Sequence, residues 1–234
     1  VNKDGFIIFG NDNKHVQELV KETNKEYYTV GINYPSDFMA KNVKMNGLIT
    51  HFDVCFREKL LGKVELHVPG LHNILNATTA IAVGNRIGID MEGMIEAIKT
   101  FRGVQRRFQI ISDIRGIKVI DDYAHHPTEI KATLRAARNC NPKKIYAIFQ
   151  PHRYTRTQLL AEEFGAAFID ADEVIITSIY SAGEQPIKGV SSALIIDSLK
   201  RNEKNVVFIE NKEDIADYIL DRAMPGDYIL TIGA

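Results

Sequence analysis

The segment 121–126 holds five side chains that could do chemistry: Asp121, Asp122, Tyr123, His125 and His126. It directly follows the apolar run 117–120, which is typical of a buried strand. Carboxylates and imidazoles at this density could transfer protons or hold a polar substrate. Turn formation would also use such residues, but their concentration in one loop favours a functional site.

A metal centre is the alternative interpretation of this loop, because imidazoles and carboxylates are common metal ligands. His125 and His126 are adjacent, however, and neither an HExxH spacing nor a nearby cysteine pair supports them. We therefore predict no metal ligands here. A His/Asp metalloenzyme stays an alternative that metal analysis of the purified protein would test.

A second polar segment follows the apolar run 145–149 and contains His152, Arg153 and Arg156. A helix that begins here would present unpaired N–H groups and the positive end of its dipole, and two guanidiniums would add bidentate donors. This combination favours a pocket for a carboxylate or a phosphate. Arginines are otherwise disfavoured at a helix N-terminus, which makes a purely exposed role the weaker interpretation.

Two further groups of residues are ambiguous. His72, Asn73 and Asn76 lie near the start of an expected helix, where an asparagine can bind a ligand or simply cap the helix. Arg106 and Arg107 precede an expected strand and could face a cleft between domains or be ordinary surface arginines. The patterns alone do not decide between these roles.

Alternating strands and helices after residue 103 must position these segments. Apolar runs predict strands over 108–111, 117–120, 145–149, 174–177, 206–209 and 228–231, and amphipathic helices over 127–139, 157–168, 191–202 and 212–223. This order predicts a doubly wound, Rossmann-like α/β fold with a largely parallel sheet. Ligands of such sheets bind beyond the carboxyl ends of the strands, where segments 121–126, 150–156 and 178–184 should meet.

The first hundred residues have a mixed α/β pattern and form a separate predicted domain. We expect a strand over 5–10, a helix after it, antiparallel hairpins over 43–68, and helices over 71–87 and 91–101. Arg102 and Gly103 mark the boundary. The predicted domains are therefore 1–102 and 103–234, with a hinge between them.

The composition excludes several classes of protein. The 234 residues include 29 Lys and Arg against 30 Asp and Glu, so a net charge of −1 predicts neither a nucleic-acid nor a membrane partner. No apolar run approaches the ~20 residues that cross a bilayer. Cys55 and Cys140 are interpreted as reduced thiols of a cytoplasmic protein. No GxxxxGK or GxGxxG phosphate loop is present, and both ends are typical of cuts in a longer chain.

Five motifs, in order, resemble the Mur ligases of peptidoglycan synthesis: VPGLHNILNA (68–77), GVQRRF (103–108), DDYAHHPTEI (121–130), FQPHRYTRT (149–157) and YSAGEQPIKG (180–189). The resemblance implies a three-domain enzyme. This chain would carry the end of the central ATP-binding domain and most of a C-terminal Rossmann-like domain that presents the amino acid. Without the phosphate loop and the UDP-binding domain, the fragment alone is expected to be inactive.

Within that family, the motifs are most similar to the members that join L-alanine to the lactyl carboxylate of UDP-N-acetylmuramate. The resemblance implies that ATP phosphorylates this carboxylate and that the alanine amine attacks the acyl phosphate. It implies ATP and Mg²⁺ as cofactors, with the metal ligands in the part that precedes this chain. Two alternatives stay open: a related ligase that adds a preformed peptide, and a Rossmann-like module that binds a nucleotide or amino acid without catalysis.

The resemblance also assigns roles by motif. For ATP, it implies adenine contacts from His72, Asn73 and Asn76, phosphate contacts from Arg107 and ribose contacts from Asp122. For L-alanine, it implies a pocket of Tyr123, His125, Arg153 and Arg156, in which the arginines hold the carboxylate. His125 and Arg107 are the candidate catalytic residues, with His125 considered as the base. Ser178 departs from an acidic residue expected there, which leaves the role of its loop, and of Glu184, open.

Overall fold

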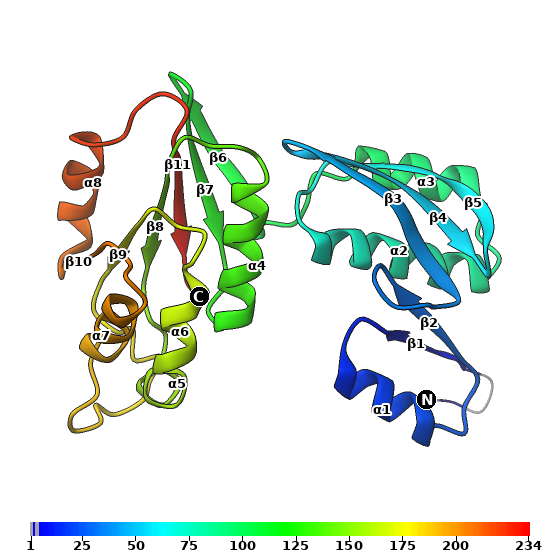
Figure 1. Cartoon of the computed structure of the whole chain (residues 1–234), viewed down its shortest axis with the longest axis horizontal. Coiled ribbons are helices and arrows are strands. Elements are labelled where there is room, and N and C mark those ends of the chain that lie inside the picture. The colour runs from blue at the N-terminus through cyan, green and yellow to red at the C-terminus, as the bar shows by residue number, and fades with distance from the viewer. Residues whose placement is uncertain (1, 3–4) are drawn as a thin grey trace. The chain divides into compact units, whose positions relative to one another are not determined.

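The computed structural model describes Asn2 and residues 5–234 and divides the chain into two compact units, Val1–Arg102 and Gly103–Ala234. Each unit has its own β-sheet with helices packed on it (Figure 1). In the described part of the chain, no helix has the length and apolar character needed to cross a membrane.

The first unit contains a five-stranded sheet in the order β1-β2-β3-β4-β5. The strands are β1 (Ile7–Gly10), β2 (Tyr27–Gly31), β3 (Phe38–Asn46), β4 (Ile49–Phe56) and β5 (Lys59–Leu66). Strands β1, β2 and β3 pair in parallel, whereas β3, β4 and β5 form antiparallel hairpins. The predicted hairpins are thus confirmed, while β2 and the parallel half of the sheet were not predicted.

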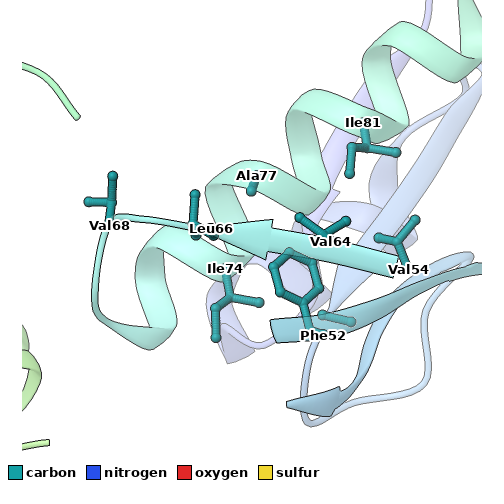
Figure 2. Packing of buried hydrophobic residues seen from close by; sticks show 9 residues of the cluster. Phe52, Val54, Val64, Leu66, Val68, Ile74, Ala77 and Ile81 are labelled. Atoms are coloured by element: carbon teal, nitrogen blue, oxygen red, sulfur yellow. The ribbon is translucent and has the colours of Figure 1, made fainter. Parts of the chain in front are cut away.

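The helices in the described part of this unit are α1 (Lys14–Glu22), α2 (Leu71–Arg86) and α3 (Met91–Thr100). Figure 2 shows Ile74, Ala77 and Ile81 of α2 facing the side chains of β4 and β5, including Phe52 and Val64. Their spacing of three and four residues places them on one face of the helix. This buried face fixes α2 on the sheet and so sets the position of its N-terminus, which begins after Gly70.

The second unit contains a six-stranded sheet in the order β10-β9-β8-β11-β7-β6. The strands are β6 (Gln109–Ile114), β7 (Ile117–Asp122), β8 (Ile145–Phe149), β9 (Glu173–Ile176), β10 (Val206–Phe208) and β11 (Tyr228–Ile232). All neighbours are parallel except β6 and β7, which form a hairpin at one edge. The predicted largely parallel sheet is confirmed.

Helices cover both faces of this sheet. They are α4 (Pro127–Arg138), α5 (Tyr154–Leu159), α6 (Ala161–Ala167), α7 (Ala193–Arg201) and α8 (Lys212–Leu220). Helix α8 packs Ile215 and Ile219 on the face of Tyr146, whereas the ring of Phe164 packs on Phe149. Because Tyr146 and Phe149 are three residues apart on one strand, they face opposite sides of the sheet. The fold is therefore doubly wound.

One predicted element was wrong. The single helix expected over 157–168 is divided at Leu160, whose φ of −119° and ψ of 19° lie outside the helical region. Two short helices, α5 and α6, replace it. The chain changes direction at this point, directly after the predicted anion-binding segment.

The strand order brings the polar loops to one edge of the sheet. Strand β11 lies between β7 and β8, so Ile232 pairs with both Asp122 and Phe149. Phe149 also pairs with Ile176 at the end of β9. The loops that follow β7, β8 and β9 therefore begin side by side, beyond the carboxyl ends of the strands.

Candidate functional site at the carboxyl edge of the second sheet

Asp122 ends β7 and turns into the protein, with only 5% of the residue exposed. Its Oδ2 accepts a hydrogen bond from the backbone N–H of Phe108 at 2.8 Å, and its Oδ1 accepts one from Ala124 at 2.8 Å. Burial raises the pKa of the Asp122 carboxyl, and the two backbone donors oppose that rise. This carboxyl thus joins the segment before β6 to the loop after β7. Its predicted contact with a ribose stays a prediction.

Arg106 supports the surface of the same loop. Its Nε donates to Oδ2 of Asp121 at 3.1 Å and its Nη2 donates to the carbonyl of Gly233 at 2.7 Å. Its guanidinium carbon lies 4.7 Å from the centre of the Tyr123 ring, and that of Arg107 lies 5.8 Å from the same ring. Arg106 is therefore a structural support that spacing alone could not identify, while Arg107 stays exposed beside Tyr123.

Glu129 organises the backbone at the start of α4. Its Oε2 accepts hydrogen bonds from the N–H groups of His125 at 3.0 Å and His126 at 3.1 Å. Burial would raise the pKa of Glu129, but these donors and the charges of His125 and Arg107 outweigh it and lower the pKa. The Glu129 carboxylate, which carries a negative charge, therefore contacts the backbone of this loop.

The His125 side chain has a defined tautomer. Its Nδ1 lies 3.0 Å from the carbonyl oxygen of Tyr123. A carbonyl oxygen only accepts hydrogen bonds, so Nδ1 carries a proton, and when the ring is neutral Nε2 carries the lone pair. The ring centre lies 5.5 Å from that of Tyr123 and 5.9 Å from that of His152. The geometry thus leaves a basic nitrogen next to the loop that follows β8.

That second loop is joined to the loop after β9. The N–H of Arg153 donates to the carbonyl of Tyr180 at 2.8 Å, and the N–H of Tyr180 donates to the carbonyl of Pro151 at 2.8 Å. The rings of His152 and Tyr180 lie 5.6 Å apart, and Nη1 of Arg156 lies 3.2 Å from Nδ1 of His152. His125, His152 and Arg156 are therefore brought together, as their loops predicted.

Glu184 holds the start of α5. Its Oε2 accepts from the N–H of Thr155 at 3.1 Å, its Oε1 accepts from the Thr155 hydroxyl at 2.6 Å, and Nη1 of Arg153 lies 3.8 Å from Oε1. The hydrogen bonds from Thr155 and the charge of Arg153 lower the pKa of Glu184. An anion was expected in this segment, and here the protein supplies one from its own loop. The sequence had left the role of Glu184 open.

The remaining predicted residues belong to the first unit, at the start of α2. Asn73 donates through Nδ2 to the carbonyl of Pro69 at 2.8 Å, and Asn76 donates through Nδ2 to Oδ1 of Asn73 at 3.4 Å. His72 and Asn76 are exposed. Asn73 therefore ties the helix to the segment that precedes it, while the Asn76 amide lies at the surface.

Across the described residues, no group of three or more His, Cys, Asp and Glu side chains is placed to hold a metal ion. The adjacent histidines have different partners, since His125 contacts the Tyr123 carbonyl whereas Nδ1 of His126 accepts from the N–H of Thr128 at 3.3 Å. His126 serves as the N-cap of α4, within a capping box that includes Glu129.

Two family models match this chain. The Mur ligase glutamate ligase domain matches residues 106–234, and the Mur ligase middle domain matches residues 1–84. The chain therefore belongs to the Mur ligase family, and the carboxyl edge described above lies within the first of these matches.

Similar curated proteins carry a more specific name. The UDP-N-acetylmuramate–L-alanine ligase of Pelotomaculum thermopropionicum is 46% identical over 236 residues, which cover 100% of this chain and 51% of that protein. The ligase of the same name from Dictyoglomus turgidum is 45% identical over 238 residues, again covering 100% of this chain and 51% of the relative. The chain thus spans about half the length of the curated relatives it matches.

Solved structures share the fold. The crystal structure of UDP-N-acetylmuramate-alanine ligase MurC from Thermotoga maritima has a TM-score of 0.75 and 33% sequence identity, covering 88% of this chain and 44% of that one. A murein peptide ligase from Psychrobacter arcticus has a TM-score of 0.67 and 24% identity, covering 100% of this chain and 49% of that chain. The second likeness supports the fold alone.

Proposed function

We propose that the full-length protein joins L-alanine to the lactyl carboxylate of UDP-N-acetylmuramate with ATP, in the cytoplasm. This chain would supply the last part of the ATP-binding domain, residues 1–102, and most of the amino-acid-presenting domain, residues 103–234. The name carried by the curated relatives supports this activity. The related ligase that adds a preformed peptide is the alternative, and a murein peptide ligase has the same fold.

The observation that carries the proposal is that Arg156 and His125 both neighbour His152. Nη1 of Arg156 lies 3.2 Å from Nδ1 of His152, and the rings of His152 and His125 lie 5.9 Å apart. An α-amino acid has its carboxylate and its amine on a single carbon. A guanidinium that binds the carboxylate and an imidazole that faces the amine therefore suit such a small zwitterion.

Arg153 and Tyr123 complete the proposed amino-acid pocket. The Arg153 side chain is 49% exposed, and its partner Glu184 lies 3.8 Å away, so it can reach a second carboxylate oxygen. Tyr123 bounds the pocket with a ring that is fixed against His125 and Arg106. We assign the two arginines to the carboxylate and Tyr123 to the wall.

We propose ATP contacts for the residues to which the family resemblance assigns them. An asparagine amide pairs well with the edge of adenine, which fits Asn76, with His72 and Asn73 beside it on α2. The exposed guanidinium of Arg107 suits the phosphates. Asp122 would meet the ribose only with lone pairs that its two backbone donors leave.

In the proposed reaction, the chain's residues align the reactants and move one proton. The amine of alanine must be neutral to attack the acyl phosphate, and Nε2 of His125 is the group that would accept its proton. Arg107 would stabilise the negative charge that develops on the phosphate. The family resemblance implies that the Mg²⁺ ligands lie in the part that precedes this chain, and we assign no step to the metal.

The test is turnover by the full-length enzyme. Phosphate release should require UDP-N-acetylmuramate and L-alanine together, with ATP. Release with a preformed peptide in place of L-alanine would favour the related ligase. Binding of L-alanine or ATP without any turnover would favour the non-catalytic binding module.

A further inference from the structure

His152 does not belong to the amino-acid pocket assigned above, yet it lies between the two groups that define it. Its ring centre lies 5.9 Å from that of His125 and 5.6 Å from that of Tyr180, and the ring is partly buried. Its Nδ1 contacts Nη1 of Arg156 at 3.2 Å. The ring is thus held on three sides, by elements that follow three different strands.

The contact with Arg156 determines the protonation of His152. A guanidinium has only donors and stays charged, so Nδ1 of His152 must carry the lone pair. His152 is therefore neutral and carries its proton on Nε2, the opposite tautomer to that of His125. A proton on Nδ1 would remove the acceptor and place a second positive charge beside the guanidinium.

We propose that His152 is a positioning residue for amino-acid binding: the neutral ring accepts a hydrogen bond from Arg156, orients its guanidinium toward the carboxylate, and releases it when the ring is protonated. The inference rests on the proposed function, in which Arg156 binds the amino acid. The same guanidinium also donates to the His152 carbonyl at 3.4 Å, so one loop residue restrains it twice.

The charges around His152 favour the neutral ring. Burial lowers the pKa of His152, and the charges of Arg156, His125 and Arg153 lower it further, while Glu184 opposes them. Tyr180, the remaining neighbour, faces the ring with its aromatic side chain. His152 is therefore neutral at pH 7.5 and becomes charged only when the pH falls below 6.5, the ordinary value for histidine.

Two substitutions in the full-length enzyme distinguish the role of the His152 hydrogen-bond acceptor from that of its side-chain volume. His152→Leu keeps much of the bulk of the side chain but removes the hydrogen-bond acceptor. It should raise the KM for L-alanine about tenfold at pH 7.5, because a hydrogen bond from a charged group is lost. His152→Asn keeps an acceptor near the position of Nδ1 but does not titrate. It should stay within about twofold of wild type. In both variants the KM for ATP should not change.

The pH dependence provides the decisive comparison. The wild-type KM for L-alanine should rise as the pH falls below 6.5, and that rise should be smaller in His152→Asn. An unchanged KM in His152→Leu would overturn the proposal. So would an acid profile of His152→Asn that matches wild type, because another group would then titrate.

A spectroscopic readout keeps the inference testable if His152→Leu does not fold. Nitrogen-15 NMR of the wild-type full-length protein at pH 7.5 should show an unprotonated Nδ1 and a protonated Nε2 at His152. The reverse tautomer, or a charged ring, would overturn the proposal without any substrate. If the enzyme does not use L-alanine, the proposed function fails, and this tautomer still decides whether His152 accepts from Arg156.

Discussion

The loops that follow β7 and β8 end at the same edge of the sheet but are held in different ways. In the β7 loop, carboxyl groups accept hydrogen bonds from the backbone, Asp122 from Phe108 and Ala124, and Glu129 from His125 and His126. In the β8 loop, backbone hydrogen bonds join Arg153 to Tyr180 and Tyr180 to Pro151, and side chains also contact the loop that follows β9. The first loop is therefore held by two carboxyl groups, and the second by its contacts with another loop.

This difference predicts that substitution of Asp122 or Glu129 in the β7 loop reduces stability, whereas substitution of Arg153 or Arg156 in the β8 loop changes amino-acid binding. The substitutions below test this expectation, in decreasing order of magnitude.

Asp122→Ala should have the largest effect, a loss of local stability. Two buried N–H groups would lose their acceptor, which should reduce the local free energy of opening by about 3 kcal/mol. Amide hydrogen exchange at Phe108 and Ala124 measures this. Asp122→Asn is the matched control, because it keeps one acceptor oxygen and should have an intermediate effect. Unchanged protection of both amides in the Ala variant would show that Asp122 does not hold these two N–H groups.

The Asn variant also tests the ribose contact. If Asp122 binds the ribose directly, folded Asp122→Asn should have a raised KM for ATP and an unchanged KM for L-alanine. A wild-type KM for ATP in this variant would leave Asp122 with a structural role alone.

Arg156→Ala should raise the KM for L-alanine about 100-fold, since charge-assisted hydrogen bonds to the carboxylate would be lost. Arg153→Ala should raise it about tenfold, because Glu184 already compensates part of the Arg153 charge at 3.8 Å. Steady-state kinetics at saturating ATP measures both. Equal effects of the two substitutions would show that Glu184 does not weaken the contribution of Arg153 to alanine binding. Normal alanine kinetics in both variants would show that neither arginine binds the carboxylate.

Glu184→Gln should lower the KM for L-alanine about threefold, because Arg153 would lose a competing anion while Thr155 keeps an acceptor. The same assay measures this change, and Glu162→Gln, at another surface ion pair with Arg201, is a control. A raised KM would instead mean that the Glu184 charge positions Arg153 for binding.

Glu129→Gln should have the smallest effect. It should lower the free energy of unfolding by about 0.5 kcal/mol, because the Glu129 side chain is 38% exposed and solvent screens its charge. The pKa of Glu129 is lowered in the folded protein, so its contribution is complete above pH 4.5, the ordinary value, and is lost as the pH falls through the lower, folded value. Thermal melts at pH 7 and pH 3 measure it. A difference that is larger at pH 3 would contradict this sign.

The sequence predicted the second unit better than the first. Short apolar strands alternate there with helices, and this alternation is a local pattern. Strand β2 was not predicted because only two of its buried residues, Tyr28 and Val30, are hydrophobic, and two positions make too short a pattern. Its parallel pairing with β1 and β3 depends on contacts that no local pattern contains.

For the site, the loops could be predicted but the contacts within them could not. The carboxyl-edge rule placed His125 and Arg156 near each other without any coordinates. Nothing in the sequence indicated that Glu184 would hold Thr155, which is 29 positions away, or that Asp122 would turn inward. Such partners are decided by the packing of loops that are remote in sequence. The roles predicted for the site residues stay predictions.

The backbone at Arg153 has a φ of 74° and a ψ of 138°, a conformation that costs a residue with a Cβ on the order of 1–3 kcal/mol. Glycine would adopt it freely but has no guanidinium. Selection for stability should thus favour glycine at position 153, whereas selection for a guanidinium at this site should favour arginine. Laboratory evolution under heat alone should drift away from arginine there, and selection for growth should restore it.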